Sequence, residues 1–579
     1  MTHIVNMPDQ VSGARRLVAA LAEMEIGVVF GVPGDTGIAL YDELAAATDV
    51  IRHVLARDER HAAYMADGYA RSTGRLAACE ASSGAGAVYL ASGLAEAYAS
   101  SVPVLVITTD IHKRSRRSGA VTEIDQTALF SGVTKWSKTV EDADEIADSV
   151  AEAAIRATSG RPGPVALVFP ENVLSAKTSS APLPPRAATV RLQAPDEAVG
   201  AAGRILASAS QPAILAGGGV HMSGAWPELL ALTEHAAIPV ATSIHGKGAL
   251  PEAHALSLGV AGGNGCRGYA NDYLADCDVT LIVGSRANAT DTNGFTAPPR
   301  DGSCQVVHID IDPSRAGRNF PRGLALVGDA AGTLRALREV LPAASPTVAA
   351  ERKRWIGRRR EEWRAQEAAQ KRASLEEGVL DPREVVQCLH DVFGGDAWVV
   401  ADPGTPTPNL AAYWESTGCA WRVMIPRGIG PMGFAIPAAI GVSVAHPGER
   451  VLCVTTESSL AMGVADWETA QRLALPITYV VLDNTSMAWI KMLQHLYMEK
   501  RYFGVEPGPV EPVLLARGMG LDGVRAADLA QLRKLAKESL HAAGPRVIHV
   551  RIPEHLVSPP PVASWRAALE DGAKERPVY

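Results

Sequence analysis

Hydrophobic and polar positions along the chain form two kinds of segment that alternate. Short runs rich in Val, Ile and Leu, such as "GVVFGVPG" and "PVLVITTD", are bounded by Gly or Pro and predict buried strands. Between them, "DERHAAYMADGYARSTG" has Ala, Met and Tyr on one face at helical spacing and a Gly at its end, which predicts a helix. Buried strands that alternate with such helices predict a parallel sheet covered by helices.

The same alternation occurs in each third of the chain. The middle third contains "PAILAGGG", "VTLIVGS" and "VVHIDID", and the last third contains "WVVADPGTP", "GFAIPAAIGVSVAH", "RVLCVTTE", "PITYVVLDN" and "RVIHVRIP". A Pro-rich stretch at 181–190 predicts a linker, and the charged stretch at 350–378 predicts a solvated connecting helix. We therefore expect an α/β protein with three doubly wound parallel-sheet domains, and the first and third domains are candidates for distant copies of one another. The expected domains are 1–180, 190–345 and 380–555, with a C-terminal tail at 556–579.

Composition narrows the class of protein. The chain has 579 residues, which is too many for one core, and its net charge of −8 argues against a nucleic-acid partner. Charges, Gly or Pro interrupt every apolar stretch, so we expect no membrane span, and the first residues do not have the pattern of a secretory signal. Seven cysteines without a CxxC motif favour a reducing compartment, and we expect a cytoplasmic protein.

A single acidic residue, Glu457, stands at the end of a predicted strand in "VLCVTTESSLAMG". A predicted helix of about three turns, "GVADWETAQRLALP", follows, and the next strand, "ITYVVLDN", ends at Asn484, 27 residues after Glu457. A right-handed crossover makes these strands parallel, so an acidic and an amide oxygen would meet at one sheet edge, where they suit Mg²⁺. The N–H groups of Ser458, Ser459 and Leu460 would point toward an anion. Alternatively, Glu457 caps a helix at a solvent edge, and this unit alone leaves both interpretations open.

Six further segments occur in a fixed order along the chain. They are "GVPGDTGIALYDEL", "RDERHAAYMADGYAR", "SSGAGAVYLASGLAEAYASSVPVLVIT", "TEIDQTALFSGVTKWS", "HIDIDPS" and "GPMGFAIPAAIG". In these segments and their order, the chain resembles the thiamine-diphosphate-dependent enzymes of the acetolactate synthase group over nearly its whole length. The resemblance implies a pyrimidine-binding, a central and a diphosphate-binding domain, with thiamine diphosphate and Mg²⁺ as cofactors.

The resemblance also assigns the metal and diphosphate contacts. The family's Gly-Asp-Gly and Asn-Asn motifs correspond here to Thr456-Glu457-Ser458 and Asp483-Asn484. It implies that Glu457, Asn484 and the backbone carbonyl of Ser486 bind magnesium. "DPGTPTPN" replaces the more usual Asp-Val-Gly-Gln-His-Gln, so Gly404 is retained while Thr405 and Pro406 stand where Gln and His are expected. The implied cofactor contacts in these and the first-domain segments are Pro33, Gly34, Gly404, Thr405, Ser458 and Ser459.

The catalytic residue that the resemblance implies is Glu59 in "RDERHAAYMADGYAR". Its carboxyl would share a proton with the aminopyrimidine ring of the cofactor, and a buried carboxyl with a raised pKa suits this task. The alternative is a surface Glu on a helix, paired with Arg57 or Arg60. In "GIGPMGF", the carbonyl of Gly430 would accept the 4′-amino group, and Met432 would wedge between the two rings of the cofactor.

The substrate end departs from the family's usual residues. Val121 and Thr122 stand where Phe and Gln are common, and "MAWIKMLQH" would bring Trp489, Ile490 and Leu493 into the pocket. The basic segment "DIHKRSRRSG" is expected to be a solvated loop, and its functional alternative is to steer an anionic acceptor. In the central domain only Arg286 is retained from the flavin-binding pattern of the family. Binding of flavin adenine dinucleotide is therefore less favoured than its absence.

The sequence thus leads to a thiamine-diphosphate-dependent carboligase that decarboxylates a 2-oxo acid and transfers the resulting acyl carbanion to an acceptor. A 2-oxo acid decarboxylase or 2-hydroxyacyl lyase of the same family is the alternative enzyme, and a catalytically silent paralogue with a binding or scaffold role is the alternative of another class. The resemblance implies a homodimer or homotetramer with the cofactor between the first domain of one subunit and the third domain of its partner. Neither the donor nor the acceptor follows from the sequence.

Overall fold

The computed structural model describes residues 10–179, 181–187, 190–370 and 375–572. It contains three sheets of six strands, and within each of them every pair of neighbouring strands is parallel. The predicted α/β fold class is therefore confirmed. The chain forms two compact units: one comprises the described residues up to 190 with 428–449 and 463–475, and the other comprises the rest.

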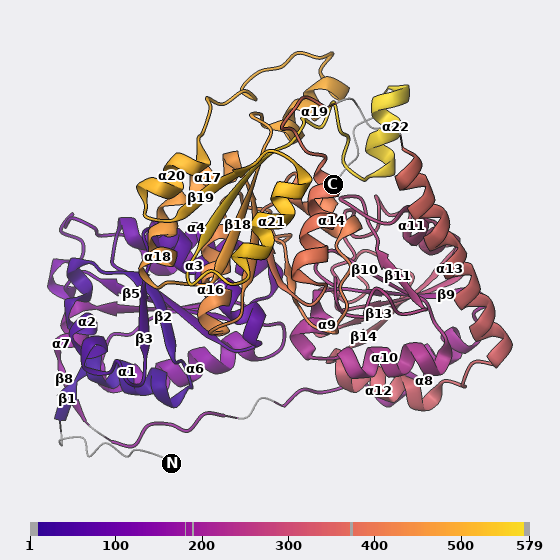
Figure 1. The fold of residues 1–579 in the computed structure, drawn as a ribbon. Helices are drawn as coiled ribbons and strands as arrows, with labels where there is room; N and C mark the ends of the chain where they lie inside the picture. Colours follow the sequence, from indigo (N-terminus) through magenta and orange to yellow (C-terminus); the bar gives the residue numbers. More distant parts are fainter. Residues whose placement is uncertain (1–9, 180, 188–189, 371–374, 573–579) are drawn as a thin grey trace. The chain divides into compact units, whose positions relative to one another are not determined.

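The first unit is built on a sheet with the strand order β3-β2-β4-β5-β7-β6, part of which is labelled in Figure 1. Its strands are β2 (Val28–Val32), β3 (Arg52–Leu55), β4 (Ala77–Ala81), β5 (Val104–Asp110), β6 (Trp136–Thr139) and β7 (Val165–Pro170). The strands β1 (Gln10–Ser12) and β8 (Lys177–Ser179) form a separate antiparallel pair. The α-helices of this unit are α1 (Gly13–Glu23), α2 (Ile38–Ala46), α3 (Glu59–Thr73), α4 (Ala85–Ser100), α5 (Gln126–Phe130), α6 (Ile146–Thr158), α7 (Glu171–Ser175), α16 (Ala435–Ala445) and α18 (Trp467–Arg472).

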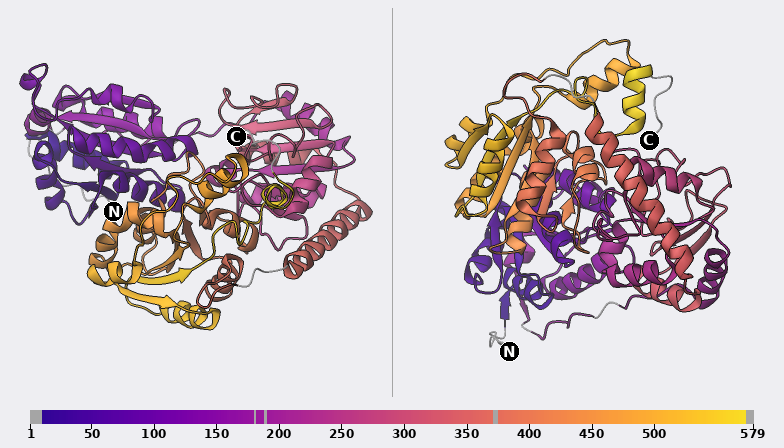
Figure 2. Two further views of the ribbon diagram at one scale, coloured as in Figure 1. Left: turned by 90° about the horizontal axis from the view of Figure 1, so that it is seen from above. Right: turned by 45° about the vertical axis from the view of Figure 1, so that its right-hand side comes forward.

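The second unit contains the central sheet, whose strand order is β11-β10-β9-β12-β13-β14. Its strands are β9 (Pro212–Ala216), β10 (Val240–Thr242), β11 (Ser257–Val260), β12 (Val279–Val283), β13 (Gln305–Asp310) and β14 (Leu324–Val327). The helices of this part are α8 (Asp196–Ala207), α9 (Gly218–Ser223), α10 (Trp226–Ala236), α11 (Gly268–Asp276), α12 (Ala330–Val340) and α13 (Pro346–Ala369). Figure 2 shows α13 as one long helix, as the charged stretch predicted, although 371–374 lie outside the described residues.

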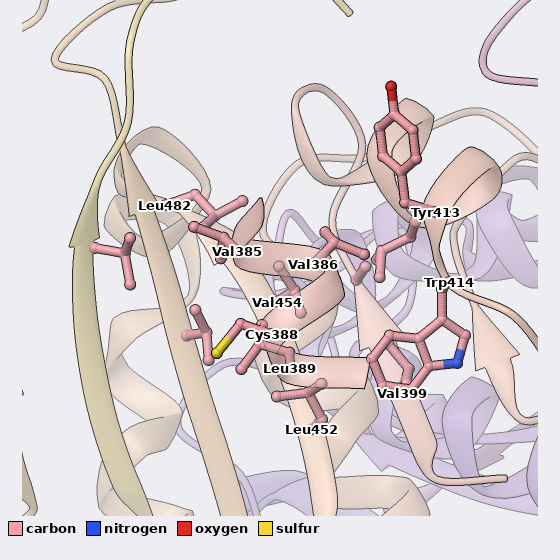
Figure 3. Packing of buried hydrophobic residues seen from close by; sticks show 14 of the residues in the cluster. Val385, Val386, Cys388, Leu389, Val399, Tyr413, Trp414, Leu452, Val454 and Leu482 are labelled. Carbon is pink, nitrogen blue, oxygen red and sulfur yellow. The ribbon is translucent and has the colours of Figure 1, made fainter. Parts of the chain in front are cut away.

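The third sheet, also in the second unit, has the order β16-β15-β17-β18-β20-β19. Its strands are β15 (Trp398–Ala401), β16 (Val423–Met424), β17 (Val451–Thr456), β18 (Ile477–Asp483), β19 (Asp522–Ala526) and β20 (Arg546–Arg551). The remaining helices are α14 (Pro382–Phe393), α15 (Pro406–Tyr413), α17 (Glu457–Gly463), α19 (Ala488–Tyr497), α20 (Pro512–Gly518), α21 (Leu529–Ser539) and α22 (Ala563–Asp571). Figure 3 shows how Val399, Leu452 and Val454 of this sheet pack against α14 and against Trp414.

The first and third sheets share one topology. In both, the strands lie in the spatial order second, first, third, fourth, sixth and fifth along the chain, whereas the central sheet runs third, second, first, fourth, fifth and sixth. This shared order supports the expectation that the first and third domains are distant copies. It also creates a switch point between the first and third strands of each sheet, where the chain leaves in opposite directions and a crevice for ligands forms.

The predicted single helix over 463–476 is wrong. The helix α17 already begins at Glu457, a 3₁₀ turn spans Val464–Asp466, and α18 covers only Trp467–Arg472. The break follows from tertiary contacts, because the Asp466 carboxylate accepts hydrogen bonds from the backbone N–H of Arg57 (3.0 Å) and from Thr469 (2.8 Å). Within the described part of the chain, no helix is both long and apolar enough to span a membrane.

Candidate functional site

The switch point of the third sheet lies between β15 and β17, and four of the predicted residues follow these strands directly. Gly404 and Thr405 come after β15, while Glu457 and Ser458 come after β17. The strand β18, which pairs with β17 in parallel register, ends just before Asn484. The expected convergence of these segments at one sheet edge is therefore present in the structure.

Glu457 is buried at this edge, with 4% of its surface exposed. Its Oε1 accepts a hydrogen bond from the Ser458 hydroxyl at 3.3 Å, but its Oε2 has no hydrogen-bond partner among the described residues. Burial raises the pKa of Glu457 to about 7, and the charge of Asp483 adds to the rise, while the backbone N–H of Asn484 opposes it. A buried carboxylate with an oxygen left over is costly unless a cation satisfies it.

Asn484 and Ser486 form a tight turn beside Glu457. The Asn484 side-chain oxygen accepts from the backbone N–H of Ser486 at 3.2 Å, and the Ser486 hydroxyl donates to the carbonyl of Val505 at 3.3 Å. Asp483 is held by His549, whose Nε2 lies 2.8 Å from the carboxylate. The turn after β18 is thus fixed from both sides, and both predicted ligands are buried in it.

The N–H groups at the start of α17 were expected to point toward an anion, and one of them differs from this expectation. The Thr456 hydroxyl accepts a hydrogen bond from the backbone N–H of Ser459 at 3.3 Å, so this N–H is already satisfied within the protein. The Ser459 hydroxyl, in contrast, is fully buried and has no hydrogen-bond partner in the described part of the chain. Thr456 therefore acts as a cap for α17, and the hydroxyl of Ser459 is the free polar atom.

Gly404 and Thr405 form the other side of this edge. Gly404 has a φ of +89°, which favours glycine, and a Cβ added there would meet nothing within 4 Å. The Thr405 hydroxyl lies 2.9 Å from Nε2 of His555, a buried residue that the sequence analysis did not single out. Burial lowers the pKa of His555 to about 4. Because this contact spans 150 residues of sequence, no local pattern pointed to it.

Two of the three predicted pocket residues on α19 pack together, and the third is exposed. Trp489 and Leu493 join a small apolar cluster with the C-terminal helix α22, in which the rings of Trp489 and Trp565 lie 5.6 Å apart. Ile490 is 42% exposed. The segment expected as a tail therefore contains a helix packed against α19, while 573–579 lie outside the described residues.

In the first unit, the corresponding switch point lies between β2 and β4. Pro33 and Gly34 follow β2, and Ser82 follows β4. A Cβ on Gly34 would come within 2.3 Å of the Ser82 side chain, so only glycine allows the two loops to approach this closely. The predicted cofactor residues of this unit thus lie where a ligand crevice is expected, at a switch point equivalent to the one in the third sheet.

Glu59 is the first residue of α3 and lies beside this crevice. Its Oε1 is 3.1 Å from the position that a Cβ on Gly86 would take, and the Ser82 hydroxyl is equally close to that position. The helix is capped by Asp58, which accepts from the backbone N–H of Arg60 at 2.8 Å. Partial burial raises the pKa of Glu59, in part opposed by a backbone hydrogen bond. The guanidinium of Arg60 lies 3.4 Å from the Asp58 carboxylate.

The helix α3 is held tightly by its neighbour α16. A Cβ on Gly441 of α16 would lie only 1.9 Å from the carbonyl oxygen of Met65, and a Cβ on Gly68 of α3 would lie 2.3 Å from the carbonyl oxygen of Ala438. His61 of α3 is also buried, with only 2% of its surface exposed, and its Nδ1 lies 2.5 Å from the Asp466 carboxylate. This contact ties α3 to the 3₁₀ turn at Val464–Asp466.

The loop after β5 carries Val121 and Thr122. The Thr122 hydroxyl lies 2.8 Å from that of Ser83 next to the crevice, and its φ of +70° is unusual for a β-branched residue. Val121 is 88% exposed. The loop is shaped by Glu123, which accepts from the backbone N–H groups of Gly119 (3.0 Å) and Ala120 (3.1 Å).

The basic segment in this loop is partly neutralised. Lys113 and Arg116 both pair with Glu141, at 3.5 Å and 2.7 Å, and Arg116 also lies 3.4 Å from Asp110. The two pairs with Glu141 are exposed, which agrees with the expected solvated loop. All these pairs reduce the charge available to steer an anion.

Three further predicted residues are Gly430 and Met432 in the first unit and Arg286 in the central domain. Gly430 has a φ of +71°, and Met432 two residues later is partly exposed. In the central domain, Arg286 donates to the backbone carbonyl of Arg427 at 2.8 Å, so its guanidinium already serves a contact within the protein.

The residues at the third sheet fit a divalent cation. Glu457 offers a carboxylate oxygen without a protein partner, while Asn484 and Ser486 add an amide and a backbone oxygen. Mg²⁺ takes few protein ligands of this kind and completes its shell with phosphate oxygens and water. The roles of all these residues toward a cofactor stay predictions.

Comparison with known proteins shows which proteins this chain resembles. Residues 11–129, 199–337 and 402–550 match the N-terminal TPP-binding, central and C-terminal TPP-binding domains of thiamine pyrophosphate enzymes. The chain is 32% identical to an acetolactate synthase of Arthrospira platensis, with 94% of each chain covered. It is 31% identical to the acetolactate synthase isozyme 2 large subunit of Escherichia coli (strain K12), covering 97% of this chain and 100% of that protein.

Proposed function

We propose, from the premise that this chain belongs to the family of thiamine pyrophosphate (diphosphate) enzymes, that it is a carboligase of the acetolactate synthase type. It would release carbon dioxide from a 2-oxo acid and transfer the remaining acyl group to an acceptor. The cofactor would supply the electron sink for this chemistry, and the protein would supply orientation and proton transfer. A decarboxylase or 2-hydroxyacyl lyase would use the same residues with a different final acceptor.

The observation that carries this proposal is the buried Glu457 with its unpartnered oxygen at the switch point of the third sheet. In the proposed role, Glu457, Asn484 and the carbonyl of Ser486 would hold Mg²⁺, which would help to bind the diphosphate. The buried Ser459 hydroxyl, which has no partner among the described residues, and the loop at Gly404 and Thr405 would contact the phosphate oxygens.

In the first unit, Glu59 would hold a proton toward the aminopyrimidine ring of the cofactor. Its raised pKa keeps part of the carboxyl protonated closer to neutral pH, which suits a group that both gives and takes a proton. The carbonyl of Gly430 would accept a hydrogen bond from the 4′-amino group, and Met432 would pack between the rings. Pro33 and Gly34 would line the same crevice.

The acceptor and the donor would meet residues that differ from the family's usual ones. Thr122 offers a hydroxyl beside Ser83, and the aromatic ring of Trp489 is fixed by the C-terminal helix. The proposed substrates are small 2-oxo acids. Incubation with a panel of 2-oxo acids, with and without added acceptor aldehydes or ketones, separates the activities, because only a carboligase forms a product whose carbon skeleton is extended.

The metal-dependent binding of thiamine diphosphate tests the proposal directly. Calorimetric titration of the parent protein should show binding with Mg²⁺ and none after chelation of divalent ions. Mass spectrometry of cofactors released from the purified protein shows in the same preparation whether a flavin is present.

Two substitutions sharpen this test. Glu457→Ala should abolish cofactor binding, because it removes the only carboxylate in the proposed set. Glu457→Asp should weaken cofactor binding, because the Asp side chain is one methylene shorter and its carboxylate reaches less far in a pocket shaped for Glu. If the parent binds no thiamine diphosphate in the presence of Mg²⁺, the chain is a catalytically silent member of the family.

A further inference from the structure

A fully buried carboxylate, Glu96, contacts three consecutive backbone N–H groups in the first unit. Glu96 lies on α4, and its two oxygens accept from Gly428 at 2.9 Å, from Ile429 at 2.8 Å and from Gly430 at 3.3 Å. These partners are more than 330 residues away in sequence. Successive N–H groups that converge in this way form a nest for an anion, and here the anion is a side chain of the protein itself.

Two side chains complete the environment of Glu96. The Ser100 hydroxyl donates to it at 2.7 Å, and the Arg71 guanidinium of α3 donates to it at 3.1 Å. Arg71 is also paired with Asp67, at 2.5 Å and 3.0 Å, and the three charged side chains are all buried. A buried charge is costly unless it is paired and hydrogen-bonded, and the donors to Glu96 meet that requirement.

The segment held by Glu96 has little freedom left. A Cβ on Gly428 would lie 2.7 Å from the Ser100 hydroxyl, so only glycine fits there. The N–H of Gly430 is bound, its φ is +71°, and the next residue is Pro431, whose ring fixes its own φ. The direction of the Gly430 carbonyl therefore depends mainly on one torsion angle, the ψ of Gly430, and the position of Met432 follows from it.

The helix α4 connects this anchor to the neighbourhood of Glu59. Its first turn contains Gly86, which lies beside the Glu59 carboxyl, and Glu96 follows ten residues later, about 15 Å along the helix. Between them, Gly93 touches the backbone of α3, since a Cβ there would be 2.5 Å from the carbonyl of Arg60. The helix α4 thus packs against α3 at Gly93 and holds the segment 428–430 at Glu96.

We propose that Glu96 is a positioning residue that holds the backbone of 428–430, so that the Gly430 carbonyl and Met432 meet the aminopyrimidine end of thiamine diphosphate. This inference rests on the proposed function, in which these two residues contact the cofactor. The competing explanation is that Glu96 only balances the charge of Arg71 and stabilises the packing of α3 against α4.

Hydrogen–deuterium exchange of the cofactor-free protein tests the anchor itself. In Glu96→Gln the side-chain amide presents a donor to groups that are themselves donors, so the amides of 428–430 should exchange at least about tenfold faster. Unchanged exchange there, in a variant with unchanged circular dichroism, overturns the proposal. Asp67→Asn is the matched control: it perturbs the same charge cluster through Arg71 but does not touch 428–430, and it should leave exchange of that segment unchanged.

Ligand binding then separates positioning from charge balance. With Mg²⁺ present, Glu96→Gln should bind thiamine diphosphate about tenfold or more weakly while it binds pyrophosphate as the parent does, because pyrophosphate lacks the aminopyrimidine ring. Glu96→Asp keeps the charge beside Arg71 but shortens the reach toward 428–430, so it should not restore the affinity. Full rescue by Asp, or an equal loss for both ligands, overturns the positioning role.

Ligand binding by the parent protein distinguishes a failure of the proposed function from a failure of the role of Glu96 alone. A parent that binds neither ligand contradicts the proposed function and with it the role of Glu96 toward a cofactor, even where the exchange experiment confirms the anchor. A parent that binds both, with no difference in the variant, contradicts only the role of Glu96. If Glu96→Gln does not fold, Ser100→Ala removes one donor to the same carboxylate and should give a smaller effect in the same direction.

Discussion

At the scale of single residues, three features meet at Glu457. Its carboxylate is buried, one of its oxygens has no protein partner, and the preceding Thr456 caps the helix that it begins. Burial raises the pKa of Glu457 to about 7, whereas a bound divalent cation would favour the charged form. A bound cation would therefore stabilise the charged carboxylate of Glu457, which without one is costly to bury. For this reason the substitution of Glu457 is the decisive test of the proposed function.

Glu59 carries a prediction of its own. We expect Glu59→Gln to keep the fold and to lower turnover by at least about 10²-fold, since a positioned proton donor contributes about that much. Steady-state kinetics with a 2-oxo acid substrate measures the effect, with Glu152→Gln on the exposed face of α6 as the control. Turnover equal to that of the parent would remove Glu59 from the mechanism.

Two buried histidines of the central domain predict how stability depends on pH. His221 accepts from the indole N–H of Trp226 at 2.8 Å and its Nε2 faces the carbonyl of Lys247 at 3.1 Å, so the ring is neutral. Burial lowers the pKa of His221 to about 3 and that of His308 to about 4. Both folded-state values lie below the ordinary value, so below about pH 6.5 the unfolded chain binds protons that the folded protein does not.

The stability contributed by these histidines is therefore complete above pH 6.5 and is lost as the pH falls toward 4. From pH 7 to pH 5 the two together should reduce the free energy of unfolding by on the order of 4 kcal/mol. Urea titrations at the two pH values measure this change. The His308→Gln variant should have a lower free energy of unfolding than the parent at pH 7. Between pH 7 and pH 5, the loss of this free energy that is due to the two histidines should be roughly half that of the parent. An identical pH dependence in parent and variant would refute the assignment.

At the scale of elements, the close contact between α3 and α16 positions the helix that begins with Glu59. Gly68 and Gly441 allow the two backbones to approach more closely than any side chain would permit. The contact between His61 and Asp466 and the cluster around Glu96 hold α3 at two further points. The site residue is thus placed by helix packing rather than by its own hydrogen bonds.

This packing predicts the effect of one methyl group. Gly441→Ala would place a Cβ 1.9 Å from the carbonyl of Met65, so the two helices must separate, at a cost of about 1–3 kcal/mol. Thermal denaturation should show a lower midpoint. Gly357→Ala on α13 is the control, since a Cβ there meets nothing within 4 Å and alanine favours the helix, so its midpoint should stay or rise. Equal midpoints for Gly441→Ala and the parent would show that the contact is not tight in solution.

At the scale of the whole molecule, the first and third sheets repeat one strand order and place their predicted residues at equivalent switch points. Large apolar side chains on the segments that follow β2, β4 and β5 of the first sheet are exposed, including Ile38 (70%), Tyr89 (55%) and Val121 (88%). Exposed large apolar side chains of this kind are typical of surfaces covered in an assembly. They support the expectation of a homodimer or a dimer of dimers.

The assembly is tested by light scattering. The active protein should have a mass at least twice the 60.9 kDa of the chain. Tyr89→Lys should shift it toward the monomer and reduce activity, because a charge would be buried at the interface, whereas Val340→Lys on α12 should change neither. A monomer that is fully active would contradict the expected assembly.

The sequence by itself determined the order and type of the elements. The central strands, such as β5, β12, β17 and β18, were predictable because they are short runs rich in β-branched residues and buried on both faces. The helix α3 was predictable from its Asp58 cap and its Gly74 end. Ordered motifs singled out Glu59 at the start of this helix and Glu457 and Asn484 directly after β17 and β18. Their roles toward a cofactor remain predictions.

Only the tertiary structure decided which distant residues meet. The break between α17 and α18 depends on contacts of Asp466 with residues more than 400 positions away, so the local helical pattern over 463–476 was misleading. His555 reaches Thr405, and Glu96 reaches 428–430, for the same reason: a buried polar group needs partners, and the fold supplies them from segments that no local spacing connects. Periodicity reports which face of an element is buried, but it does not report what that face touches.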